Sequence, residues 1–221
     1  MSRPRNFTKI LITAGPTREK LDSVRFISNR SSGNMGYEIT KAALKRGYKV
    51  TLISGPTNLN APKGAHFIRT EGAGDMYKAV KKNFRSSDCL FMASAVCDWR
   101  PRRIVRGKIK KGPKSVSLRL VETPDILGSV GKRKDGKVLV GFALESSNLV
   151  KNAKEKLEKK NLDFIVANRM GKRLTPFGGG PTDVTIIDKY GAKESIANTT
   201  KARIAGRLLD KAEKIWQEER R

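Results

Sequence analysis

Short apolar runs alternate with stretches of helical periodicity along most of the 221-residue chain. Buried strands are expected at 9–15, 49–55, 66–70, 89–96, 137–145, 163–168 and 184–188, and a half-exposed strand at 115–123. Helices are expected from Met35 to a stop at Gly47, at 74–86, from Pro124 with Thr123 as its cap, at 148–160 and at 199–219. Loops are expected at 98–114 and 171–183. Because strands that alternate with helices form a sheet covered by helices, this order predicts a mostly parallel α/β fold.

Length and cysteine content limit the class of protein. A chain of this size suits one domain, 1–221, or one domain with a small appendage. The apolar run at 10–14 is too short for a signal peptide or a membrane span. Cys89 and Cys97 lie in one apolar stretch, which favours buried thiols over a disulfide. We therefore expect a soluble cytoplasmic protein.

The net charge of +26 leaves several partners open. Such a chain can bind nucleic acid, an anionic membrane or acidic small molecules. Its basic residues are spread out, with clusters only at 100–114 and 155–161, and it has neither an RNP-like aromatic signature nor a Cys/His finger. A small anionic substrate explains the charge about as well, and a basic nucleic-acid-binding module stays as an alternative.

The segment "SSGNMG", 31–36, leads directly into a predicted helix. Unpaired N–H groups at a helix N-terminus bind phosphates, although a tight loop packed on the first strand would look the same. The segment is not G-x-G-x-x-G, and no acidic residue clearly ends the second strand to bind a ribose. An NAD(P)-dependent reductase is therefore only a weak alternative.

Other candidate groups follow predicted strands or lie on loops. Asp98 follows a buried strand, where a carboxylate can bind a ribose, a base amine or a metal, or can cap a turn. The lysines of "GKIKK", 107–111, suit a lid over phosphates or a solvated charge run. Lys156 and Lys160 share a helix face and suit a polyanion or an ordinary surface. His66 is the only histidine, and no metal-ligand cluster is evident.

Several of these segments occur together in one known family. The stretch "LITAGPTREKLDSVRFISNRSSGNMGYEITKAALKRGYKVTLISGP", followed by "ASAVCDWRP", "GKIKK", "ETPDIL", "VGFALES" and "NLDFIVAN", resembles the phosphopantothenoylcysteine synthetase (phosphopantothenate–cysteine ligase) family from residue 8 to about 215. Bacterial members often carry a flavin-dependent decarboxylase domain ahead of this one. The chain resembles the free-standing form, without that domain.

The resemblance implies a Rossmann-like core and a reaction in coenzyme A biosynthesis. A nucleotide, CTP in most bacterial members and ATP in eukaryotic ones, activates the carboxylate of 4'-phosphopantothenate and releases pyrophosphate. The amine of L-cysteine then attacks the acyl-nucleotide, releasing the nucleoside monophosphate. Mg²⁺ assists, and the family forms a homodimer whose sites borrow residues from the partner. We expect CTP, with ATP possible, and neither a nucleic-acid nor a membrane partner.

The resemblance also implies roles for individual residues. Asn29 and Lys108 match catalytic positions: Asn29 binds phosphopantothenate and helps to turn over the acyl intermediate, and Lys108, on a flap, assists its formation. The remaining substrate contacts are Arg25 and Ala95. The nucleotide contacts are Gly15, Ser31, Ser32, Gly33, Met35, Gly36, Asp98, Lys108, Pro124, Asp125, Ile126, Leu127, Phe142, Lys156 and Lys160. No protein metal ligand is expected.

A few positions depart from the family pattern. Ser94, Cys97 and Trp99 replace the usual alanine, alanine and tyrosine, Leu144 replaces a common alanine, and Arg169 replaces an aspartate. These departures leave Asn29, Asp98 and Lys108 unchanged. They put base selectivity and fine pocket shape in question, not the reaction.

Overall fold

An eight-stranded sheet forms the centre of the molecule in the computed structural model, which describes residues 7–112, 115–169 and 180–220. The strand order is β12-β11-β10-β9-β6-β1-β4-β5. Neighbours from β10 to β5 are parallel, and β11 and β12 add an antiparallel edge. The bounds are β1 Lys9–Ala14, β4 Lys49–Ser54, β5 His66–Arg69, β6 Cys89–Met92, β9 Val138–Glu145, β10 Phe164–Arg169, β11 Thr182–Asp188 and β12 Lys193–Thr199.

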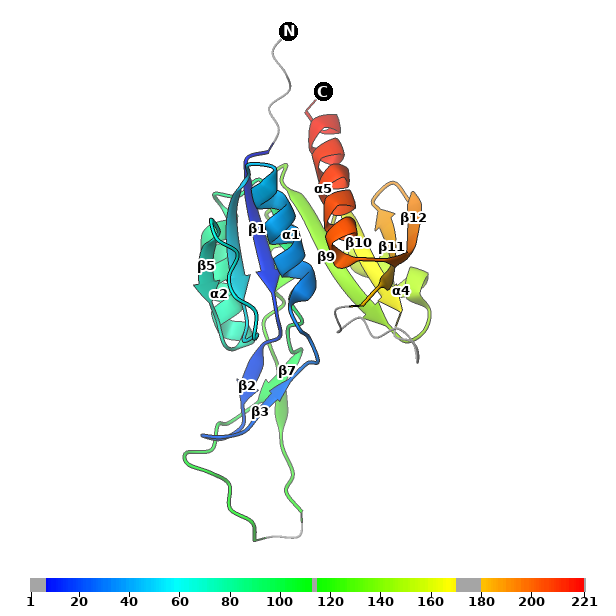
Figure 1. Ribbon diagram of the computed structural model, residues 1–221. Coiled ribbons are helices and arrows are strands. Elements are labelled where there is room, and N and C mark those ends of the chain that lie inside the picture. The colour runs from blue at the N-terminus through cyan, green and yellow to red at the C-terminus, as the bar shows by residue number, and fades with distance from the viewer. Residues whose placement is uncertain (1–6, 113–114, 170–179, 221) are drawn as a thin grey trace.

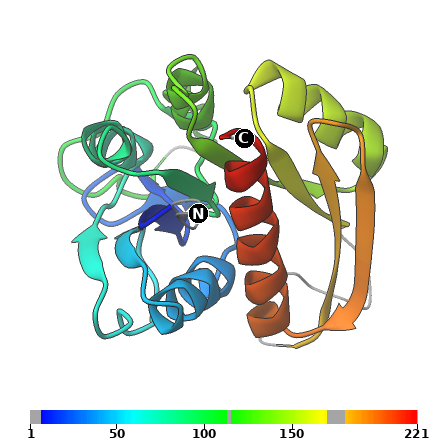
Figure 2. The ribbon, with the colours of Figure 1, turned by 90° about the horizontal axis from the view of Figure 1, so that it is seen from above.

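Helices cover both faces of this sheet (Figures 1 and 2). On one face lie α1, Asn34–Lys45, and α5, Lys201–Glu218; on the other lie α2, Ala73–Phe84, α3, Ile126–Gly131, and α4, Leu149–Lys159. Alternate side chains of each strand enter opposite cores: Ile10 and Ile12 pack under α1 and α5, and Leu11 packs under α2. This arrangement confirms the predicted Rossmann-like α/β fold with a mostly parallel sheet.

Two small hairpins extend beyond the carboxyl ends of the parallel strands (Figure 1). One pairs β2, Arg18–Lys20, with β3, Phe26–Ser28; the other pairs β7, Trp99–Pro101, with β8, Leu120–Glu122. We call the described residues of 18–28 and 99–122 the arm. Most of the exposed large hydrophobic side chains of the described chain lie on it: Val24, Phe26, Trp99, Ile104, Val105, Val116, Leu118 and Leu120.

The arm is also where the predicted elements were least accurate. The expected strand at 115–123 is reduced to the three residues of β8, and the expected loop at 98–114 contains β7. The hairpin of β2 and β3 was not predicted, because three-residue strands leave almost no periodicity to detect. β12 was missed for a different reason: its burial alternates, but its side chains are mostly polar. Most of the predicted loop at 171–183 lies outside the described residues.

Two local predictions have clear outcomes. Thr123 does not cap a helix that starts at Pro124: the α3 cap is Asp125, whose Oδ1 accepts the Gly128 N–H at 3.0 Å, and Thr123 donates its hydroxyl to the Cys97 carbonyl at 2.6 Å. Cys89 and Cys97 are both buried free thiols, as predicted. Within the described residues, none of the helices combines the length and apolarity that a membrane crossing requires.

Candidate functional site

The predicted phosphate loop lies where β1, α1 and the turn after β4 meet. Gly33 caps α1 with φ 80° and Gly15 follows β1 with φ 71°, both in the left-handed region that favours glycine. A Cβ on either residue would lie 2.8 Å from Thr57 Cγ2. The loop is therefore packed too tightly for side chains at these two positions, and its inner surface is backbone.

Donors are available at the start of α1. The hydroxyl oxygens of Ser31 and Ser32 accept the N–H groups of Gly33 and Asn34, at 3.3 and 3.5 Å. In the rest of the first turn of α1, the N–H groups have no carbonyl oxygen one helical turn earlier to which they could donate a hydrogen bond. Such a turn can hold phosphate oxygens.

Packing also explains part of the same motif. A Cβ on Gly36 would lie 2.6 Å from Ala14 Cβ and 2.8 Å from the Thr13 carbonyl oxygen, so this glycine lets α1 lie directly on β1. Met35 is half-buried against the core on that face. The phosphate-binding and packing interpretations of 31–36 are thus both compatible with the geometry, at different residues.

Asn29 is held at the edge of this loop by backbone carbonyls. Its Nδ2 donates to the carbonyl oxygens of Val96 at 3.0 Å and Ala95 at 3.4 Å. Ala95 in turn donates its N–H to the Gly15 carbonyl at 2.8 Å and accepts the Thr17 N–H at 3.2 Å. We call Gly15 and residues 31–36 the glycine loop. The exposed Asn29 lies beside this loop, and among the described residues its Oδ1 has no hydrogen-bond partner.

A second group of predicted residues gathers at the carboxyl end of β9. Lys156 of α4 donates to the Phe142 carbonyl at 2.8 Å. Burial lowers the pKa of Lys156, against the opposing attraction of Asp98 and Glu145. The backbone carbonyl of Asp98 accepts the Thr123 N–H at 2.9 Å. The side-chain carboxylate of Asp98 is exposed and remains available beside Lys156.

Asp125 and Lys160 join the same group through an ion pair. Partial burial raises the pKa of Asp125, but the Lys160 ammonium and the Gly128 N–H outweigh it, so the pKa lies below its ordinary value. Ile126 and Leu127 bury their side chains in the core under α2 and α4. Only the backbone of these two residues is left to face a ligand, and Pro124 is exposed.

Lys108 and Arg25 lie on the arm. Lys108 is exposed, and the next residue, Ile109, donates its N–H to Asp22 Oδ2 at 3.0 Å. Arg25 Nη1 donates to Asp22 Oδ2 at 2.8 Å and to the Ile109 carbonyl at 3.1 Å. The guanidinium expected to meet a substrate phosphate is therefore engaged in holding the arm within this chain.

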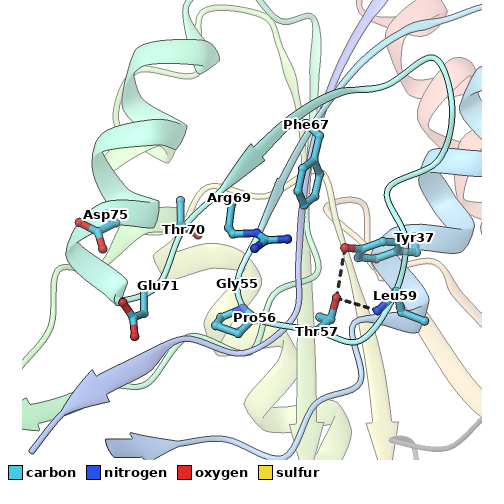
Figure 3. Close-up of a pocket in the computed structure, with 10 residues that line it drawn as sticks. All are labelled: Tyr37, Gly55, Pro56, Thr57, Leu59, Phe67, Arg69, Thr70, Glu71 and Asp75. Carbon is cyan, nitrogen blue, oxygen red and sulfur yellow. Dashed lines mark hydrogen bonds between the residues drawn. The ribbon is translucent and has the colours of Figure 1, made fainter. Parts of the chain in front are cut away.

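The predicted site residues thus lie in three separate places: the glycine loop with Asn29, the group around Phe142 and Lys156, and the arm with Lys108. The sequence analysis missed a fourth feature, a cavity of about 520 Å³ beyond the ends of β4 and β5 (Figure 3). Gly55 and Thr70, at its edge, end the predicted strands 49–55 and 66–70, but the sequence did not indicate that these ends line a cavity. No group of three or more possible metal-ligating His, Cys, Asp or Glu residues occurs in the part of the chain that the structure describes.

Comparison with known proteins decides the family. The DFP family, described as the DNA/pantothenate metabolism flavoprotein C-terminal domain, matches residues 6–215. The chain belongs to this family. It is 41% identical over 209 residues to the coenzyme A biosynthesis bifunctional protein CoaBC of Bacillus subtilis (strain 168), covering 94% of this chain and 52% of that protein. The chain thus spans about half the length of the curated relatives it matches.

Solved structures support the fold. The C-terminal domain of a CoaBC protein superposes with a TM-score of 0.82 at 36% identity, covering 96% of each chain. A Cab2 mutant, H337A, in complex with phosphopantothenate-cysteine superposes with a TM-score of 0.77, covering 97% of this chain and 89% of that one. At 16% identity, the second likeness concerns the fold alone.

Proposed function

We propose that this chain is a phosphopantothenate–cysteine ligase of coenzyme A biosynthesis. The carboxylate of 4'-phosphopantothenate attacks the α-phosphorus of a nucleotide, pyrophosphate leaves, and the amine of L-cysteine displaces the nucleoside monophosphate. Family membership and the CoaBC relatives support this reaction, and a protein of the same fold, the Cab2 mutant, was solved with phosphopantothenate-cysteine. The observation that carries the proposal is Asn29, fixed beside the glycine loop at the start of α1 that we propose to bind phosphates.

The orientation of Asn29 suggests how it acts. Its two amide hydrogens are directed to the carbonyls of Ala95 and Val96, so the group left for substrate is the Oδ1 acceptor. An acceptor suits the attacking amine of cysteine, which must lose a proton as the amide forms. We therefore assign Asn29 to the second half-reaction, in which its Oδ1 accepts a hydrogen bond from the amine of cysteine.

The nucleotide is proposed to extend from the group around Phe142 to the glycine loop. Asp98, Asp125, Lys156 and Lys160 supply donors and acceptors for a base and ribose, and the start of α1 supplies N–H groups for phosphates. CTP is the proposed nucleotide, with ATP as the competitor. Because no acidic cluster gathers among the described residues, Mg²⁺ is proposed to be bound mainly by the phosphate oxygens, where it neutralises their charge.

The assembly and location are proposed on similar grounds. The apolar arm suits a homodimer, in which the partner would complete each site. The two buried thiols and the coenzyme A biosynthetic relatives suit the cytoplasm.

Pyrophosphate release with each nucleotide tests the proposal. We expect release only when nucleotide, phosphopantothenate and Mg²⁺ are present, product formation only when cysteine is added, and CTP to be preferred over ATP. Lys108→Gln should slow pyrophosphate release by about a hundredfold, as loss of one cation at a developing charge does, whereas Lys63→Gln, an equal change of charge elsewhere, should not.

The alternatives make opposite predictions. Consumption of NAD(P)H would indicate a reductase, and tight, salt-sensitive binding to DNA or RNA would indicate a nucleic-acid-binding module. If neither CTP nor ATP supports pyrophosphate release with both substrates present, the ligase proposal is wrong.

A further inference from the structure

The cavity at the ends of β4 and β5 adjoins the glycine loop through Thr57 and Gly55, which line the cavity and lie against Gly15. Thr57 packs its Cγ2 against Gly15 and Gly33, and its hydroxyl bonds to Tyr37 Oη at 3.1 Å on the cavity side. Figure 3 shows Tyr37 and Thr57 on one side of this cavity, with Arg69 directed toward them. The cavity is therefore a direct neighbour of the predicted phosphate site.

Two polar groups in the cavity wall lack partners. Thr70 is 7% exposed, and its buried Oγ1 forms no hydrogen bond within the described residues. Arg69 likewise pairs with none of the described residues. Arg69 is exposed, so its guanidinium is free to bind an oxyanion, and the buried Thr70 hydroxyl is costly to leave unpaired; together they suit a ligand rich in oxygen and negative charge.

The carboxylates of the cavity do not oppose such a ligand directly. Glu71 pairs with Lys20 at 3.3 Å, and Asp75 accepts the Gly72 N–H at 3.2 Å at the start of α2. In Figure 3 both lie on the α2 side, away from the direction in which the guanidinium points. The part of the cavity between Arg69 and Thr57 thus holds one cation and the hydroxyl groups of Thr57 and Tyr37, beside the ring of Phe67.

The strand order fixes how this cavity lies relative to the proposed nucleotide. From β9, beside the group around Phe142, the order runs through β6 and β1 to β4. The strand register puts Ile53 of β4 level with Gly141 of β9, and three strand steps of about 4.8 Å place them about 14 Å apart. A nucleotide whose base lies at β9 and whose α-phosphate lies near Asn29 would direct its terminal phosphates toward β4.

We propose that this cavity receives the pyrophosphate that leaves during activation, with Arg69 and Thr70 as its binding groups. The carboxylate oxygen of phosphopantothenate bonds to the α-phosphorus as the bond from that phosphorus to the α–β bridging oxygen breaks. The bridging oxygen leaves with the electron pair, as part of pyrophosphate. Arg69 stabilises the charge on the leaving pyrophosphate. Once pyrophosphate occupies the cavity, it no longer blocks the approach of cysteine to the acyl-nucleotide. This inference rests on the proposed ligase function.

Calorimetric binding of inorganic pyrophosphate, with Mg²⁺ present, tests the site without requiring activity. Arg69→Gln should weaken binding about tenfold or more, since it removes a charge-assisted contact, whereas Arg85→Gln, at the far end of α2, should bind as the wild type does. Thr70→Val should also weaken binding while leaving the thermal midpoint unchanged or higher, because the lost hydroxyl has no partner to leave unpaired.

Kinetics separate this inference from the proposed function. With an active ligase, inhibition by added pyrophosphate should weaken about tenfold in Arg69→Gln. If Arg69→Gln and Thr70→Val bind pyrophosphate as the wild type does, the cavity is not the site, even if the ligase reaction is confirmed. If the wild type shows no ligation but binds pyrophosphate through Arg69, the function fails and the anion site stands.

Discussion

Asn29 owes its orientation to two backbone carbonyls and not to another side chain. Those carbonyls belong to Ala95 and Val96, which are placed by hydrogen bonds between the segments that follow β1 and β6. A change to aspartate replaces the Nδ2 donor by a second acceptor placed against them. The residue is therefore sensitive to a substitution that preserves its size.

The substitution Asn29→Asp tests the role of this side chain with the least change in its size. A carboxylate cannot donate to Ala95 or Val96, and its charge is repelled by both carbonyls, so the side chain must turn away. We expect nucleotide binding to persist and the acyl-nucleotide to accumulate, with product formation slower by about a hundredfold. Quenched-flow trapping of the intermediate measures this.

Asn60→Asp is the matched control, because it makes the same change at an exposed position in the turn after β4. It should form product at the wild-type rate. Full product formation by Asn29→Asp would remove Asn29 from the catalytic residues.

At the scale of elements, the arm depends on one buried carboxylate. Asp22 is 2% exposed and accepts the N–H groups of Val24 and Arg25 at 2.7 Å and that of Ile109 at 3.0 Å. It thereby joins the turn between β2 and β3 to the segment that carries Lys108. The Ile109 N–H is the main reason that the pKa of Asp22 falls to about 2.

This lowered pKa predicts how the arm responds to acid. A carboxyl group whose folded pKa lies below its unfolded value stabilises the fold above the unfolded value, here 3.8, and loses that effect as the pH falls through about 2. Proteolysis of the arm should therefore accelerate between about pH 4 and about pH 2 in the wild type. Asp22→Asn should be cleaved faster at neutral pH and should lose most of this pH dependence.

An acid-tolerant protease, with cleavage mapped by mass spectrometry, measures the effect. Asp183→Asn is the control, because Asp183 accepts the Asn198 N–H far from the arm. An arm that is cleaved at the same rate in Asp22→Asn and the wild type would contradict the role of this carboxylate.

At the scale of the whole molecule, the arm has no core of its own. Val24 is 61% exposed and Ile104 is 60% exposed, and the arm extends away from the central sheet (Figure 1). Apolar side chains gathered in this way mark an interaction surface. A second copy of the chain is the proposed partner, since the sites would then be shared across the interface.

Charge introduced on the arm should break that dimer. We expect the wild type to sediment as a dimer, and Val24→Asp combined with Ile104→Asp to sediment as a monomer with an unchanged circular dichroism spectrum. Tyr190→Asp is the matched control, because Tyr190 is 66% exposed on the turn between β11 and β12 and should leave the dimer intact. Analytical ultracentrifugation measures the oligomeric state of each variant, and a monomeric wild type would contradict the proposed dimer.

The sequence alone was enough to predict the parallel strands of the sheet and the helices that cover it, although the strand predicted at 89–96 ends at Met92. Runs such as 9–15 and 163–168 are apolar because both faces of the strand are buried, and that pattern is local. The resemblance to a known family singled out Asn29, and the serine and glycine residues directly before a predicted helix singled out the 31–36 loop. The roles of these residues stay predictions that the experiments above test.

Which side chains come into contact became clear from the folded chain alone. Each strand of the arm has only three residues, too few to show a periodicity, and β7 and β8 pair across the whole of 102–119. The folded chain likewise reveals the contacts of Asp22 with Ile109 and of Lys156 with Phe142, and the cavity beside Thr57. Arg69 and Thr70 look like ordinary strand-end residues in the sequence; their lack of partners becomes visible only when the chain is folded around them, because pairing is a property of space and not of sequence order.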